Sequence, residues 1–174
     1  DGGATWAAST SGLPPHLRTR RLAQSPSQPD IVYVSLKGKA GETPWQAGVY
    51  RSEDGGQTWQ PRVNGLRQAV GKPGTSDMLC TWVDALAVHP TRPEVVYAGG
   101  ATWWDATVYK TEDGGLNWRR TFAFGEKGNA RHAWLDMWGP SVTCLTLSQA
   151  HPDTLYFGTS GYIYKTDDGG ATWR

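Results

Sequence analysis

Short apolar stretches rich in Val, Ile, Tyr and Thr alternate along the chain with polar segments that carry proline and glycine. In one part of the chain these stretches cover residues 83–88, 95–99, 106–111 and 116–122. Such stretches, bounded by turn-forming residues, are typical of short β-strands, and none has the period of about 3.6 residues expected of an amphipathic helix. The pattern predicts an all-β chain.

The chain also repeats itself. One nine-residue motif ending in Trp occurs at residues 51–59, 110–118 and 165–173, and residues 1–6 repeat its last part. The four Trp residues are separated by 53, 59 and 55 residues, which is close to the length of a four-stranded propeller blade. The repeat therefore predicts a β-propeller.

Two further elements recur upstream of each full motif. A Pro-Asp/Glu-x-Val/Leu-Tyr element or a close variant occupies residues 29–33, 93–97 and 152–156, and a Leu lies 11 residues before each of its Tyr residues. This constant spacing inside a variable period indicates a fixed unit with variable loops. We predict one propeller segment over residues 1–174, whose parts are residues 1–8 (an isolated fourth strand of a preceding blade) and blades 17–63, 83–122 and 142–174, the last with a truncated fourth strand.

Each unit is expected to contain four antiparallel strands, named A to D in chain order. The A-to-B links carry Pro, and the C-to-D link is the Asp-Gly-Gly turn, in which Gly supplies a positive φ. Because successive turns of a meander alternate ends, the A-to-B and C-to-D turns share one end of the blade. The B-to-C and D-to-A links share the other end.

The Ser/Thr-x-Asp-x-Gly-x-Thr/Asn-Trp motif is identified as the Asp-box, or BNR repeat. The surrounding strands resemble the propellers of sortilin-type VPS10 domains and of family 74 xyloglucan hydrolases. The resemblance implies an all-β propeller of four-stranded antiparallel blades with Asp-box hairpins between strands C and D. It also implies a secreted, periplasmic or lumenal location. Asp-boxes occur in receptors, sialidases, hydrolases and assembly factors, so the motif does not select an activity.

The Asp and Trp residues of the Asp-boxes are expected to be structural. A tight turn needs an acceptor for its N–H groups, and a residue repeated in every blade is better suited to holding blades together than to one chemical step. The alternative is a set of catalytic carboxylates or calcium ligands; we expect neither a metal nor a cofactor. The residues assigned to this structural set are Asp1, Trp6, Asp54, Trp59, Asp113, Trp118, Asp168 and Trp173.

Six of the ten Trp residues lie outside the Asp-boxes, and all six fall in or beside B-to-C and D-to-A links. Aromatic planes accompanied by carboxylates and hydrogen-bond donors suit sugars, whose C–H faces stack on rings. The alternative is an aromatic surface that packs on a neighbouring protein domain. The ligand-binding residues that this predicts are Trp45, Trp82, Trp103, Trp104, Asp105, Trp134 and Trp138.

A hydrolase would need two carboxylates about 5–10 Å apart around one sugar, and Asp84 and Asp105 are weak catalytic candidates. The family 74 resemblance implies an acid after a Tyr-x-x-Thr sequence, where this chain has Ser160. The three-arginine cluster of a sialidase is not recognisable. A non-catalytic ligand-binding or interaction segment is therefore the first prediction. A glycoside hydrolase fragment and a scaffold or assembly factor are the alternatives.

Charge and hydropathy restrict the partners. With 17 basic and 16 acidic residues the net charge is +1, which does not suit a nucleic-acid binder, and no stretch approaches the roughly 18 apolar residues of a membrane helix.

Three blades are fewer than the four to eight of most propellers and leave two open sheet edges. We therefore expect either further blades of a longer parent chain or a second copy that closes a six-bladed ring.

The remaining expectations concern individual residues and one ion pair. His89 and His151 lie in His-Pro turns and are expected to be solvated. Cys144 aligns with Ala85 and is expected to be buried, whereas Cys80 is expected in a loop; a disulfide between the two remains open. Arg20 and Asp84 occupy equivalent positions in consecutive blades. They are expected to form an inter-blade ion pair, and the alternative is an anion contact by Arg18, Arg20 and Arg21.

Overall fold

The chain folds into antiparallel β-sheets. The computed structural model describes residues 2–15, 18–37, 47–69, 78–80, 82–101, 106–123 and 141–174. Within these ranges no helix is long and apolar enough to cross a membrane.

Three of the sheets correspond to the three predicted blades. The first contains β1 (Arg18–Gln24), β2 (Val32–Lys37), β3 (Gly48–Ser52) and β4 (Gln60–Arg62). The second contains β7 (Trp82–Val88), β8 (Val96–Ala101), β9 (Ala106–Thr111) and β10 (Arg119–Ala123). The third contains β11 (Cys144–Leu147), β12 (Leu155–Gly158) and β13 (Ile163–Thr166). Every neighbouring pair is antiparallel and consecutive in the chain, which confirms the predicted all-β fold class.

A fourth, two-stranded sheet was not predicted. It pairs β5 (Arg67–Ala69) with β6 (Met78–Cys80), inside the link between the first and second blades. Cys80 therefore ends a short strand, and the expectation of a loop at this residue was wrong. The strand was missed because the hairpin is only three residues long on each side.

The N-terminal segment differs from an ordinary strand. Residues 2–10 form no strand, and Ser11 makes an isolated bridge to Thr58. Trp6 is 91% exposed, unlike the Asp-box Trp residues of the first and second sheets, which are buried. Within the described residues, no strands A to C lie against Trp6. Asp1 lies outside the described residues.

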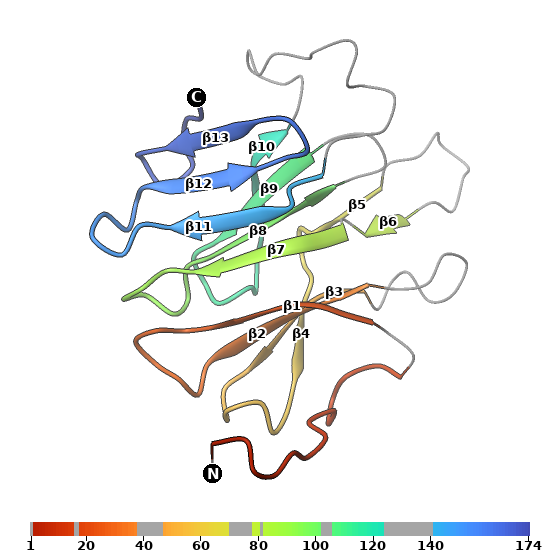
Figure 1. Ribbon diagram of the computed structural model, residues 1–174. Coiled ribbons are helices and arrows are strands. Elements are labelled where there is room, and N and C mark those ends of the chain that lie inside the picture. The colour runs from red at the N-terminus through yellow and green to blue at the C-terminus, as the bar shows by residue number, and fades with distance from the viewer. Residues whose placement is uncertain are drawn as a thin grey trace.

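The three large sheets stand side by side, with strand β7 between β1 and β11 (Figure 1). One apolar cluster fills the space between the first and second sheets and includes Tyr33, Val49 and Trp118. Another cluster joins the second and third sheets through Phe122 and Phe157. These two clusters are thus built between blades, so the faces that form them depend on the neighbouring blade for their burial.

The Asp-box hairpins and the A-to-B turns share one end of each sheet, as predicted. A backbone hydrogen bond joins the two turns in every blade, from Gly55 to Asp30, from Gly114 to Glu94 and from Gly169 to Asp153, each 2.9 Å long. The B-to-C and D-to-A links therefore leave from the opposite end.

Two further single-residue expectations were wrong. His89 is buried rather than solvated, and its Nδ1 accepts the backbone N–H groups of Thr91 and Arg92 at 3.2 and 3.1 Å. Burial lowers its pKa, helped by the nearby charge of Arg92. Cys144 is an exposed free cysteine, although the aligned Ala85 is buried, because another sheet covers Ala85 and nothing in the described residues covers Cys144.

Candidate functional site

The Asp-box carboxylate closes its own turn. Asp113 Oδ1 accepts hydrogen bonds from the backbone N–H of Asn117 at 2.9 Å and from the Thr111 hydroxyl at 2.7 Å. Its Oδ2 accepts from the Asn117 side chain at 2.9 Å. The Thr111 hydroxyl in turn accepts the backbone N–H of Gly115. Both carboxylate oxygens of Asp113 thus accept hydrogen bonds from residues of their own turn.

The same bonds recur in the other two complete Asp-boxes. Asp54 accepts from both the backbone and the hydroxyl of Thr58, and Asp168 does so from Thr172. Both Gly residues of each turn have a φ between 66° and 93°, a region that residues with a Cβ rarely adopt. Among the described residues, no group of three or more His, Cys, Asp or Glu side chains could hold a metal ion.

These hydrogen bonds stabilise the ionised carboxylates. The hydroxyl and backbone of Thr58 lower the pKa of Asp54 to about 2, and bonds from Thr166 and Thr172 hold the pKa of Asp168 well below its usual range. Burial opposes ionisation of Asp113, but the bonds from Asn117 outweigh it and lower the pKa. The lowered pKa values therefore indicate carboxylates that are hydrogen-bonded within their own turns rather than carboxylates that act as reactive acids.

Acid is expected to destabilise the fold through these carboxylates. Because the folded pKa of Asp54 is about 2 and its ordinary value is 3.8, the unfolded chain takes up this proton first as pH falls. The stabilisation is complete above pH 3.8 and is lost as pH falls toward 2. We expect Asp54→Asn to flatten the pH dependence of the free energy of unfolding in this window, measured by urea titration. An unchanged slope in the variant would contradict this role.

A buried tyrosine joins each of the first two sheets to the next one. The Tyr33 hydroxyl donates to the carbonyl of Pro93 at 2.9 Å, and the Tyr97 hydroxyl donates to the carbonyl of Gly169 at 3.0 Å. Burial raises the pKa of both phenols to about 12, so they remain neutral donors. A cation lies beside each ring, Arg51 near Tyr33 and Lys110 near Tyr97.

The predicted ligand-binding Trp residues belong to what we call the Trp-rich end, the end of the sheets with the B-to-C and D-to-A links. Of these residues the structure places Trp82, at the first position of β7 and 45% exposed. The Lys37 ammonium lies 3.8 Å from the centroid of its ring. The remaining members, Trp45, Trp103, Trp104, Asp105, Trp134 and Trp138, lie outside the described residues.

Lys37 was not singled out from the sequence, although a signal for it exists. It lies four residues after Tyr33, where the other two repeats have the small residues Ala101 and Ser160. A long cationic side chain at a position that is otherwise small marks a departure from the repeat. Such departures are where a repeat protein places ligand-specific groups.

Arg20 and Asp84 form the predicted inter-blade ion pair. Arg20 Nη2 and Nε lie 2.6 and 2.9 Å from Asp84 Oδ1, while the Ser141 hydroxyl donates to Asp84 Oδ2 at 3.2 Å. Each charged residue lies at an irregularity in the register of its strand, β1 or β7. Both carboxylate oxygens of Asp84 thus have partners, and no sequence signal pointed to Ser141.

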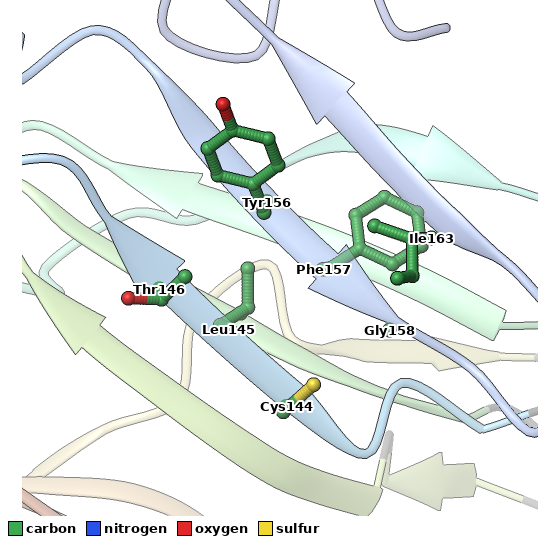
Figure 2. A pocket seen from close by; sticks show the side chains of 7 residues that line it. All are labelled: Cys144, Leu145, Thr146, Tyr156, Phe157, Gly158 and Ile163. Atoms are coloured by element: carbon green, nitrogen blue, oxygen red, sulfur yellow. The ribbon is translucent and has the colours of Figure 1, made fainter.

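The third sheet carries a shallow depression of about 330 Å³ on the face away from the second sheet. Figure 2 shows its lining from β11 and β12, with Tyr156 and Ile163 standing over the strands. The full lining consists of Cys144, Leu145, Thr146, Tyr156, Phe157, Gly158 and Ile163. This lining is mostly apolar and contains no charged group, which suits packing rather than catalysis.

Comparison with known proteins agrees with this architecture. Residues 50–61 match the family model described as the BNR/Asp-box repeat. A xyloglucanase from Paenibacillus sp is 26% identical over 166 residues, which cover 87% of this chain and 15% of the relative. The chain therefore spans less than a fifth of the length of this curated relative.

Two solved structures share the fold. An ancestral GH74 enzyme superposes with a TM-score of 0.59 at 16% identity, over 90% of this chain and 18% of that chain. YCF48 bound to D1 peptide superposes with a TM-score of 0.57 at 17% identity, over 94% of this chain and 40% of that chain. Together with the three in-phase Asp-boxes, these matches show that the chain has the fold of an Asp-box β-propeller segment and a sequence similar to that of a xyloglucanase.

Proposed function

We propose that this propeller segment is a non-catalytic binding module that recognises a glycan through its Trp-rich end. The observation that carries the proposal is the exposed ring of Trp82, with the Lys37 ammonium 3.8 Å from its centroid. The ammonium lies over one face of the ring, so a sugar would stack through its C–H groups on the other face and offer its hydroxyls to polar neighbours. The sequence relationship to a xyloglucanase supports a polysaccharide as the ligand class.

A protein partner is the second candidate. It is favoured by the shared fold with YCF48, which was solved with a D1 peptide bound. Exposed Trp residues also anchor protein interfaces, where a few aromatic residues carry most of the binding energy. In this alternative the same Trp-rich end packs on a protein surface, and no glycan binds there.

A glycoside hydrolase fragment is a weaker alternative. Asp84 has its two oxygens engaged by Arg20 and Ser141, which favours a fixed carboxylate over a proton donor to a leaving group. Asp105, the other candidate, lies outside the described residues. Ser160 also stands where the family resemblance implies an acid.

Replacing Trp82, Trp103 or Trp104 by Ala is expected to weaken glycan binding by about 1–3 kcal/mol, roughly 5- to 150-fold, because an aromatic anchor is lost. The measurement is calorimetry with xyloglucan oligosaccharides, followed by a panel of plant, bacterial and animal glycans. Leu116→Ala is the matched control, since Leu116 is an exposed apolar residue on an Asp-box hairpin at the opposite end.

Intrinsic Trp fluorescence offers an independent readout. Bound sugar should shift the emission of the wild-type chain and shift it less in Trp82→Ala. If the whole glycan panel leaves both the emission and the melting temperature unchanged, the glycan proposal is wrong. The protein-partner alternative would then replace it.

A further inference from the structure

The first sheet places two like charges opposite each other at the Trp-rich end. Register pairs Arg18, the first residue of β1, with Lys37, the last residue of β2. Side chains at such directly opposed positions have Cβ atoms about 4.5–5.5 Å apart, and like charges there destabilise a sheet. Among the described residues, neither cation has a carboxylate within ion-pair distance. The repulsion between the two charges is therefore uncompensated in the described part of the chain.

The repeated fold does not require this pair of cations. In the second sheet, register gives Trp82 and Ala101 as the equivalent pair. In the third repeat, the same spacing within the motif gives Ser141 and Ser160. A residue that every blade needs for folding would be similar in each repeat. The two opposed cations are thus a departure that belongs to the first blade alone among these three.

The pair lies on the face of the first sheet that points toward the second sheet. The Lys37 ammonium lies over the Trp82 ring of β7, the strand beside β1 (Figure 1). Arg18 shares this face because the two residues are opposite in register. The other face of the sheet holds Val34 and Leu36, which belong to the cluster that includes Leu13. A blade that preceded the first sheet would pack on that other face and would leave the pair uncovered.

Two more cations follow on β1. Arg20 pairs with Asp84, whose second oxygen accepts from the Ser141 hydroxyl. The Arg21 guanidinium donates to the carbonyl of Arg20. We call Arg18, Arg20, Arg21 and Lys37 the cationic cluster. Its four cations contact one carboxylate among the described residues, although the whole chain has nearly equal numbers of basic and acidic residues. The excess positive charge creates a local field that attracts anions.

Building on the glycan recognition proposed above, we propose that the ligand of the Trp-rich end is an acidic polysaccharide, whose carboxylate or sulfate group lies between Lys37 and Arg18. An anion there removes the repulsion between the two cations and accepts charge-assisted hydrogen bonds from both. Lys37 covers one face of Trp82, so the sugar that stacks on the other face is a neighbour of the acidic sugar along the polymer.

The combination of ring and charges selects this class of ligand. A neutral polysaccharide would stack on Trp82 but would leave the two opposed charges without an anion. An acidic peptide would supply the anion but would not require the exposed ring. An acidic polysaccharide supplies both a C–H face for the ring and anionic groups for the cationic cluster.

Calorimetry with matched acidic and neutral oligosaccharides tests the charge requirement. The acidic probes are oligogalacturonate, an alginate oligosaccharide and a sulfated galactan oligosaccharide, and the neutral probes are carboxyl-reduced oligogalacturonate and a xyloglucan oligosaccharide. At least one acidic probe is expected to bind at least tenfold more tightly than both neutral probes, and the preferred one identifies the anionic group. If a neutral probe binds as tightly as every acidic one, the charge requirement is wrong while glycan recognition stands. If no probe binds, glycan recognition itself is wrong.

Two variants assign the effect to the cationic cluster. Arg18→Gln and Lys37→Gln should each weaken binding of the acidic probe about tenfold and leave binding of the neutral probes unchanged. Arg18→Gln keeps the contact of Lys37 with the ring, so it separates charge from stacking. Arg119→Gln is the matched control, because Arg119 is an exposed cation that follows the Asp-box at the opposite end of the second sheet. An equal loss in Arg119→Gln would indicate attraction by overall charge and would overturn the proposed site.

Salt and melting temperature provide independent readouts. Raising the ionic strength from about 0.05 M to about 0.5 M should weaken binding of the acidic probe several-fold in the wild type and less in Arg18→Gln. Without ligand, Arg18→Gln should melt at the same temperature as the wild type or higher, because a repulsion is removed. A lower melting temperature would show that Arg18 serves the fold and would overturn the proposal. A polyglutamate peptide that binds as tightly as the acidic glycans, and equally well in Trp82→Ala, would replace the polysaccharide by a protein partner.

Discussion

Replacing Phe122 by Ala is expected to lower the free energy of unfolding by about 3–5 kcal/mol, the usual cost of removing a buried phenyl ring. Phe122 joins the second and third sheets, with ring centroids 4.8 Å from Phe157, 5.0 Å from Tyr164 and 6.1 Å from Trp173. The variant leaves a cavity between blades and also loses these aromatic contacts. Urea unfolding followed by circular dichroism measures the effect.

Leu116→Ala is the control for this prediction. Leu116 is an exposed apolar residue close in sequence to Phe122, so its truncation should change stability by less than about 0.5 kcal/mol. Equal losses of unfolding free energy for the two variants would contradict a core shared between blades. A loss confined to Phe122→Ala supports stability that arises between blades.

Asp113→Ala is expected to cost about 1–3 kcal/mol of stability, since the backbone N–H of Asn117 and the Thr111 hydroxyl lose their acceptor. Because the bonds of Asp113 stay within its own turn, ligand binding by the folded protein should be retained. The measurement pairs thermal unfolding with glycan calorimetry on the same sample.

A carboxylate of the third Asp-box provides the control for the Asp-box prediction. Asp167 pairs with the Lys165 ammonium at 2.7 Å and both side chains are partly exposed, so Asp167→Ala should cost less than about 1 kcal/mol. If Asp113→Ala instead abolished binding while the melting temperature stayed unchanged, the structural role of the Asp-box carboxylates would be wrong.

Local motifs could be predicted because the residues that contact one another in them are only a few positions apart in the sequence. The hydrogen bonds of Asp54 and Asp113 reach no further than four residues along the chain, so the nine-residue pattern contains nearly the whole turn. Repetition of that turn after each Pro-Asp/Glu-x-Val/Leu-Tyr element then predicted the strand order and the antiparallel blades. The end of the sheet at which each link emerges followed from the parity of the turns.

Burial was not predictable in the same way, because it depends on which sheet covers which face. Val49 and Ile163 hold the same place in the repeat, yet one is buried and the other exposed. Cys144 was expected to be buried like Ala85, and His89 was expected to be solvated. Within the described residues no sheet covers Cys144, whereas one covers Ala85, and His89 is buried because its turn folds over its own side chain.

Contacts between residues far apart in the sequence could not be predicted from the repeat either. The Lys37 ammonium reaches Trp82, and Ser141 reaches Asp84, although the partners are far apart in the sequence and do not belong to one motif. The repeat predicts that strands β1, β7 and β11 stand side by side, but it does not predict which side chains meet across them. The local turns and the blade architecture were therefore encoded in short-range sequence, whereas the pairing of side chains across blades arises from the packing of whole sheets.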